Sequence, residues 1–206
     1  FSTELIKSAG LVGVSDKDGS VYDYFRDRLI FPIEDPRGQV IGFGARALGG
    51  VKPKYLNSPE SPSFVKKSVL YGWSRARKAA RRGLPVIVVE GYMDVIAVSS
   101  SGVAAAVAPL GTALGEDQFR LLWKLSNDPV LCFDGDKAGQ IAAQRAIERV
   151  LPLLEPGRSV RLAVLPEGQD PDDILRQKGP DGLRRILSAA TGLLDSLWAS
   201  KAADYH

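Results

Sequence analysis

The sequence holds one cysteine and one histidine among 206 residues. Cys132 has no second thiol with which to form a disulfide within the chain, and a single thiolate cannot build a cysteine-based zinc site. His206 is the last residue, and chain ends fray more often than they bind metals. We therefore expect no zinc module inside these residues and a buried Cys132 thiol, which fits a reducing cytoplasm.

Long apolar runs are missing as well. No stretch approaches the roughly 20 apolar residues of a membrane-spanning helix, and no signal-peptide pattern opens the chain. The phosphate-binding motif GxxxxGK[ST] is absent, so nothing supports an ATPase or a helicase. The chain starts at Phe1 rather than Met, and we expect it to be a fragment of a longer protein without contact to a membrane.

The net charge of +3 hides an uneven distribution. Residues 1–84 contain 15 Lys and Arg against 8 Asp and Glu, whereas residues 85–206 contain 12 against 16. Within residues 40–82 there are ten basic residues and a single acid, Glu60. A charge run is most often a solvated face, but this division also favours one part that binds polyanions and another that gathers cations.

The first part, residues 1–84, reads as a basic α+β subdomain. Residues 3–9 predict a short helix that stops at Gly10. The stretch RLIFPIEDPRGQVIGFGARAL predicts two strands joined by a type I turn at 35–38, since Asp, Pro and Gly occupy the positions that such a turn favours. A basic helix is expected over residues 74–82, ended by Gly83.

From residue 85 onward, apolar strands alternate with helices. Continuously apolar strands that alternate with helices are typical of a parallel sheet covered on both faces. The fold class is therefore α/β, with this sheet over residues 85–169 and a C-terminal helical subdomain over residues 170–206. The expected strands are PVIVVE, VAAAVA, PVLCF and VRLAVL.

Acidic residues follow three of these four strands. They are Glu90, Asp94, Asp134, Asp136, Asp170 and Asp172. Because the carboxyl ends of parallel strands share one edge of the sheet, we expect these acids to lie close together and to repel one another without a cation. Oxygen ligands with no histidine or thiolate nearby select a hard ion, Mg²⁺ or Mn²⁺.

Each acid taken alone also has a structural interpretation. Glu90 can be a helix cap or a strand-end contact with solvent, and an Asp-Gly-Asp sequence occurs in ordinary turns. Asp170 and Asp172 suit the start of the helix that follows them. Three acidic clusters at three parallel strand ends nevertheless favour the metal site.

Two motifs give a family resemblance. VVEGYMDV, followed about forty residues later by DGDKAG, resembles the Toprim domain of primases, topoisomerases, nucleases and recombination mediators. The segments RDRLIFPI, GFGAR, KYLNSPE and FVKKSVLYG, together with PLGT and DPDD, look like the catalytic core of bacterial DnaG-type primases. The resemblance extends from about residue 20 to about residue 175.

The resemblance implies synthesis of RNA primers on single-stranded DNA from ribonucleoside triphosphates, with Mg²⁺ as cofactor and Mn²⁺ as substitute. It assigns catalysis to Glu90, Asp134 and Asp136, supported at the metal by Asp94, Asp170 and Asp172. It assigns nucleotide and template binding to Arg46, Lys54, Tyr55, Asn57 and Lys66. Two ions serving the attacking and leaving oxygens suit this chemistry; whether Glu90 is a ligand or a general base stays open.

The family also implies parts and partners beyond these residues. A zinc-binding module and a C-terminal module that contacts the replicative helicase are both absent here, and we expect a monomer in the bacterial cytoplasm. The alternatives are a Toprim nuclease, a topoisomerase fragment and a non-catalytic module for single-stranded DNA. None of the six tyrosines lies in a recognisable topoisomerase setting, whereas the acids alone do not separate a nuclease from a primase.

Overall fold

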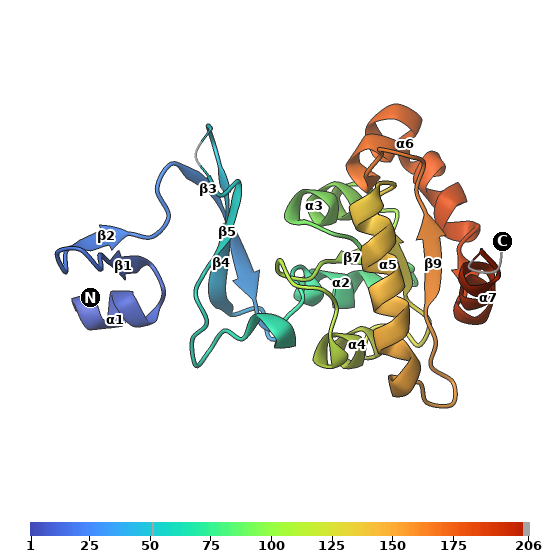
Figure 1. Ribbon diagram of the computed structural model, residues 1–206, viewed down its shortest axis with the longest axis horizontal. Coiled ribbons are helices and arrows are strands. Elements are labelled where there is room, and N and C mark those ends of the chain that lie inside the picture. Colours follow the sequence, from blue (N-terminus) through green and yellow to red (C-terminus); the bar gives the residue numbers. More distant parts are fainter. Residues whose placement is uncertain (51, 204–206) are drawn as a thin grey trace. The chain divides into compact units, whose positions relative to one another are not determined.

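The computed structural model describes residues 1–50 and 52–203, so His206 lies outside the described residues. The chain forms two compact units, one ending at Lys66 and the other starting at Lys67 (Figure 1). The sequence instead places a division near residue 84. The difference arises because the helix before residue 84 is packed into the core of the second unit.

The first unit has a short helix, a two-stranded sheet and a three-stranded antiparallel sheet. Its elements are α1 (Thr3–Ser8), β1 (Val12–Val14), β2 (Val21–Asp23), β3 (Arg28–Glu34), β4 (Val40–Ala47) and β5 (Tyr55–Asn57). The predicted helix at the start and the predicted hairpin of β3 and β4 are confirmed. In the hairpin turn, the N–H of Gly38 donates to the carbonyl of Asp35 over 2.9 Å, and the Asp35 side chain accepts from Arg37 and Gln39.

The second unit contains a five-stranded sheet in the order β10-β9-β8-β6-β7. Its strands are β6 (Val86–Val88), β7 (Ala105–Val107), β8 (Val130–Phe133), β9 (Arg161–Val164) and β10 (Thr191–Gly192). The four predicted strands are parallel to one another, as expected. The fifth, β10, pairs antiparallel with β9, so the sheet is mixed at one edge.

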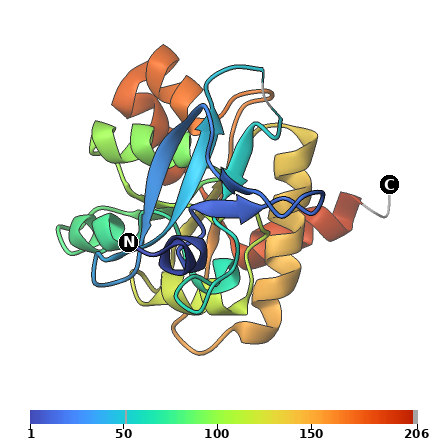
Figure 2. The ribbon, with the colours of Figure 1, turned by 90° about the vertical axis from the view of Figure 1, so that its left-hand side faces the viewer.

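Helices cover both faces of this sheet. They are α2 (Trp73–Ala80), α3 (Tyr92–Ser101), α4 (Glu116–Trp123), α5 (Lys137–Val150), α6 (Pro171–Ser188) and α7 (Leu193–Ala203), with short 3₁₀ turns η1 (Lys66–Ser68) and η2 (Leu151–Leu153). Val86 and Val88 join one core cluster with residues of α2, α4 and α5. Successive strand residues face opposite sides, so Ile87 faces the other layer, where α3 lies beside α6 (Figures 1 and 2).

Two local features refine the sequence-based picture. Helix α6 lies in the predicted C-terminal helical subdomain and is broken at Gly179, where φ is 65°. Cys132 is buried and free, as predicted. No helix among residues 1–50 and 52–203 is long and apolar enough to cross a membrane.

Candidate metal centre

The first two acidic clusters meet at the carboxyl edge of the parallel strands. Asp134 directly follows β8, and Glu90 lies two residues beyond the end of β6, the neighbouring strand. The Glu90 carboxylate accepts a hydrogen bond from the backbone N–H of Asp134 over 3.0 Å. The structure therefore brings together Glu90 and Asp134, which are 44 residues apart in the sequence.

Asp94 connects this edge to the third cluster. Its side chain is buried in the first turn of α3 and accepts from the N–H of Gly91 over 3.1 Å. Burial raises the pKa of Asp94 from 3.8 to about 7, helped by the negative charge of Asp170 and, more weakly, by that of Asp172. Asp94 is thus close enough to Asp170 for the two carboxylates to repel each other electrostatically.

Asp134 lies in the middle of these charges. Burial raises its pKa to about 7, and the negative charges of Glu90, Asp94, Asp170 and Asp136 add to the rise, in that order. Its Oδ1 atom is buried and accepts no hydrogen bond from any described residue. A buried carboxylate oxygen without a partner is costly. It is the kind of atom that a bound cation would satisfy.

The remaining acids also have the capping roles that the sequence left open. Asp136 caps α5 by accepting from the N–H of Gly139 over 2.8 Å. Asp170 caps α6 by accepting from the N–H of Asp173 over 2.7 Å. Asp172 lies 3.1 Å from Arg176 in an ion pair. These bonds fix the positions of the acids, and a cap keeps a second carboxylate oxygen that a cation can share.

Across the described part of the chain, no three His, Cys, Asp or Glu side chains form a ready-made group for a metal ion. This finding is compatible with the electrostatic coupling of the acids, because charges act over far longer distances than the 2.0–2.6 Å of a metal–oxygen bond. The acids fit a hard cation by their oxygen chemistry and by the unsatisfied Oδ1 of Asp134. Enclosing an ion requires their side chains to turn toward it.

Gly135 explains how the third cluster reaches the first two. Its N–H donates to the carbonyl of Gln169 over 3.1 Å, and its own carbonyl accepts from Gly168 over 3.1 Å. A side chain at Gly135 would overlap the carbonyl of Pro166. Glycine is required at this position because the two backbone segments are in close contact.

Replacing Gly135 with alanine is expected to push the loop before α6 away from Asp134. We expect a loss of roughly 1–3 kcal/mol of stability, typical of overpacking, which lowers the melting temperature by a few degrees. The control is Gly49→Ala, because a Cβ at Gly49 meets open space and Gly49 lies outside the helices and strands. Thermal melts of both variants test this; equal melting temperatures would show that the contact at Gly135 carries no strain.

The five basic and polar residues assigned to nucleotide and template lie in the first unit. Arg46 on β4 is opposite Tyr55 on β5. Asn57, two residues after Tyr55 on β5, also pairs with β4. The Lys54 ammonium is 5.9 Å from the centre of the Tyr55 ring. Lys66 lies outside the sheet, in η1, where its backbone N–H donates to the Glu60 carboxylate. The structure thus places three of the five residues on one sheet, with Lys54 immediately before strand β5.

A hollow beside Glu90 was not identified from the sequence. It has a volume of about 250 Å³, and its walls include Thr112, Phe133, Ile141 and Arg145. The loop on its rim is held by Arg149, which donates to the carbonyl of Leu114 over 2.9 Å. The exposed Ile141 on a polar helix face was the available signal.

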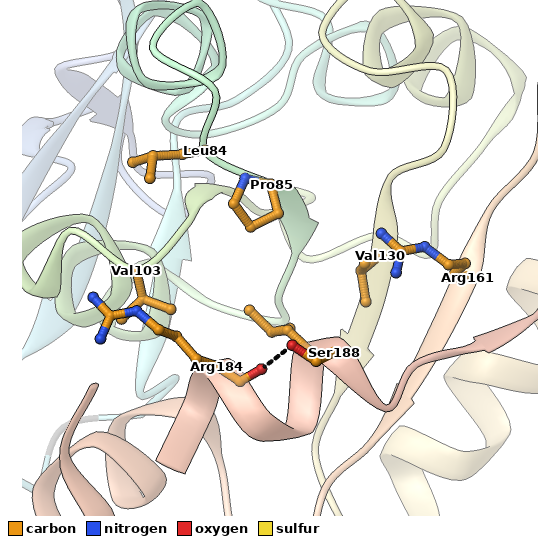
Figure 3. Close-up of a pocket in the computed structure, with 8 residues that line it drawn as sticks. Leu84, Pro85, Val103, Val130, Arg161, Arg184 and Ser188 are labelled. Carbon is orange, nitrogen blue, oxygen red and sulfur yellow. Dashed lines mark hydrogen bonds between the residues drawn. The ribbon is translucent and has the colours of Figure 1, made fainter. Parts of the chain in front are cut away.

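A second hollow, of about 370 Å³, lies where the parallel strands begin, at the edge opposite the acids. Figure 3 shows Pro85, Val103 and Val130 around it, with Arg161 and Arg184 at its sides. Both arginines already have carboxylate partners, Asp128 at 2.8 Å and Asp181 at 2.6 Å. Each arginine that lines this hollow is therefore already balanced by an acid among the described residues.

Comparison with known proteins agrees with the division of the chain into a basic first part and an acidic second part. Residues 85–163 match the Toprim domain, which defines the class of the acidic unit. Residues 1–77 match the N-terminal domain of the DNA primase catalytic core. Proteins of these families generally use divalent metal ions.

Known relatives narrow the class. The DNA primase of Pseudomonas aeruginosa is 50% identical over 188 residues, which are 91% of this chain and 28% of the relative. A crystal structure of a DNA primase domain from that organism has 47% identity and a TM-score of 0.90, covering 96% of this chain and 62% of that one. A DnaG primase catalytic domain bound to single-stranded DNA has 42% identity and a TM-score of 0.87, covering 96% and 61%.

The chain belongs to the family of DnaG-type primase catalytic cores, with a Toprim domain in its second unit. It spans about a third or less of the length of the curated relatives that it matches, between 28% and 34% of them.

Proposed function

We propose that this chain is the catalytic core of a DNA primase, which makes short RNA primers on single-stranded DNA by nucleotidyl transfer from ribonucleoside triphosphates. The observation that carries this proposal is the set of coupled acids around the unsatisfied Asp134 Oδ1, at the strand ends of a Toprim domain. The relative solved with single-stranded DNA supports the choice of template.

In this proposal, Glu90, Asp134 and Asp136 hold the catalytic ions, supported by Asp94, Asp170 and Asp172. Bound Mg²⁺, or Mn²⁺ in its place, lowers the pKa of the primer 3′-hydroxyl and neutralises the leaving pyrophosphate. Asp134 offers its unpaired oxygen. Glu90 is fixed against the Asp134 backbone, and the capping bonds hold Asp136 and Asp170.

The five basic and polar residues of the first unit handle the substrates. Arg46, Lys54 and Lys66 provide cationic donors for triphosphate and template phosphates. Tyr55 is 41% exposed, which leaves its ring able to stack on a base. Asn57, on the same strand, contributes an amide for polar contacts.

The partners of the whole protein are part of the same proposal. A zinc-binding module and a module that contacts the replicative helicase belong to other parts of a complete primase. We propose that the core acts as a monomer in the bacterial cytoplasm.

One experiment separates this function from its alternatives. The chain is incubated with a single-stranded template, labelled ribonucleotides and Mn²⁺, and the products are resolved by length. New labelled RNA supports a primase. Shortened template without RNA means a Toprim nuclease, and template binding with neither product means a binding module.

A further inference from the structure

Helix α2 and the turn after it carry an unusual density of positive charge. Residues 61–89 contain seven Lys and Arg and no Asp or Glu. Three of the cations, Lys78, Arg81 and Arg82, are exposed and lie at the end of α2; we call them the α2 basic face. This face belongs to the second unit, so it is separate from the basic sheet around Arg46 and Tyr55.

The packing of α2 turns these cations toward solvent. Trp73, Ser74 and Ala76 are buried on its inner side, and the Trp73 indole donates to the carbonyl of Leu121 over 3.1 Å. Arg81 and Arg82 follow Lys78 by three and four residues, at the C-cap of α2 and in the turn after it, so both lie near Lys78 at the end of the helix. None of the three has an ion pair or side-chain hydrogen bond with a residue that the structure describes.

The direction of α2 separates its basic face from the acids. Tyr71, just before α2, pairs with Ala108, just after the end of β7, so the helix begins near the carboxyl edge of the sheet. Leu84 and Pro85, just after α2, lead into the start of β6. The helix therefore runs from the acidic edge toward the opposite edge over about 12 Å, and its cations are gathered at the far end.

A structural explanation covers only part of this pattern. Cations in the last turn of a helix interact favourably with its dipole, but three neighbouring like charges repel one another. An anionic partner removes that repulsion. A row of exposed Lys and Arg matches the phosphate backbone of a nucleic acid, which such residues bind without reading its sequence.

We propose that the α2 basic face binds the phosphate backbone of single-stranded nucleic acid outside the metal centre. This proposal rests on the proposed function only for the choice of nucleic acid as the partner. The face would hold template that has moved beyond the acidic edge, and it would add affinity for strands long enough to reach it.

The test uses fluorescence anisotropy with labelled single-stranded DNA of about 8 and about 30 nucleotides, without metal or nucleotides. The test variant is Lys78→Ala/Arg81→Ala/Arg82→Ala. The control is Lys178→Ala/Arg184→Ala/Arg185→Ala, which removes the same charge from exposed positions on α6. We expect the test variant to bind the long strand roughly 10-fold more weakly than the wild-type chain. The slope of log K against log salt should become less steep by about 2.

The control variant should stay within about twofold of the wild-type chain, as expected for lost net charge alone. Equal weakening in both variants, or none in either, would overturn the proposal. So would an equal loss for the short and long strands. If the test variant loses affinity for polyglutamate as strongly as for DNA, the face binds acidic protein segments instead. Because the assay contains no nucleotides, failure of primer synthesis does not affect its result.

Discussion

Asp134→Asn and Glu90→Gln are each expected to reduce primer synthesis by roughly 1000-fold or more, since binding of a catalytic ion contributes several kcal/mol to the transition state. Asp134 supplies the one buried carboxylate oxygen of the acidic cluster that has no partner among the described residues. Glu90 both contributes charge and holds the Asp134 backbone. Affinity for single-stranded DNA should change by less than about twofold, because the cations that bind phosphates are elsewhere.

The measurements are primer yield with labelled ribonucleotides and Mn²⁺, and DNA affinity by anisotropy, on the same preparations. Asp181→Asn is the matched control, because Asp181 is an exposed acid whose one ion-pair partner among the described residues is Arg184. Its yield should equal that of the wild-type chain. Near-normal yield from Asp134→Asn or Glu90→Gln would show that these acids do not hold the catalytic ions.

The parallel sheet was predictable because its strands are buried on both faces. Val86–Val88 and Val130–Phe133 are continuously apolar, and no solvated face interrupts the pattern. The hairpin of β3 and β4 was predictable from its turn residues. By contrast, β2 is exposed along its length and β10 has two residues, so neither carries a periodic pattern that a sequence can reveal.

The metal centre was predictable in position but not in detail. Strand ends placed Glu90 and Asp134 at one edge, whereas the bond between them depends on side-chain geometry. The bonds between Gly135 and the loop before α6 join segments more than thirty residues apart, which no local pattern records. Similarly, the sequence presents one basic run over residues 40–82, and only the structure shows that Lys78 and its neighbours belong to the second unit.

The metal-free protein is expected to lose stability as the pH rises from about 4 to about 7. The fold raises the pKa of Asp134 from its ordinary value of 3.8 to about 7, and it raises the pKa of Asp94 similarly. In that interval the folded state holds protons that the unfolded state has released, so each unit of pH weakens folding. Above pH 7 the two carboxyl groups are ionised in both the folded and the unfolded state. Their contribution to the free energy of unfolding then stays constant at its most unfavourable value.

Asp134→Asn should therefore stabilise the protein in chelator at pH 8 by about 1–2 kcal/mol, after allowance for the solvent screening of a half-buried carboxylate. The gain should vanish near pH 4, where the wild-type carboxyl is already protonated. Excess Mn²⁺ should raise the melting temperature of the wild-type chain by binding its folded state, and it should raise that of the variant much less.

Thermal melts of both proteins at pH 4 and 8 in chelator, and at pH 8 in Mn²⁺, make the comparison, with Asp181→Asn as the control that should follow the wild type. If Asp134→Asn is less stable under every condition and shows the same shift with Mn²⁺, Asp134 supports the fold and does not bind the ion.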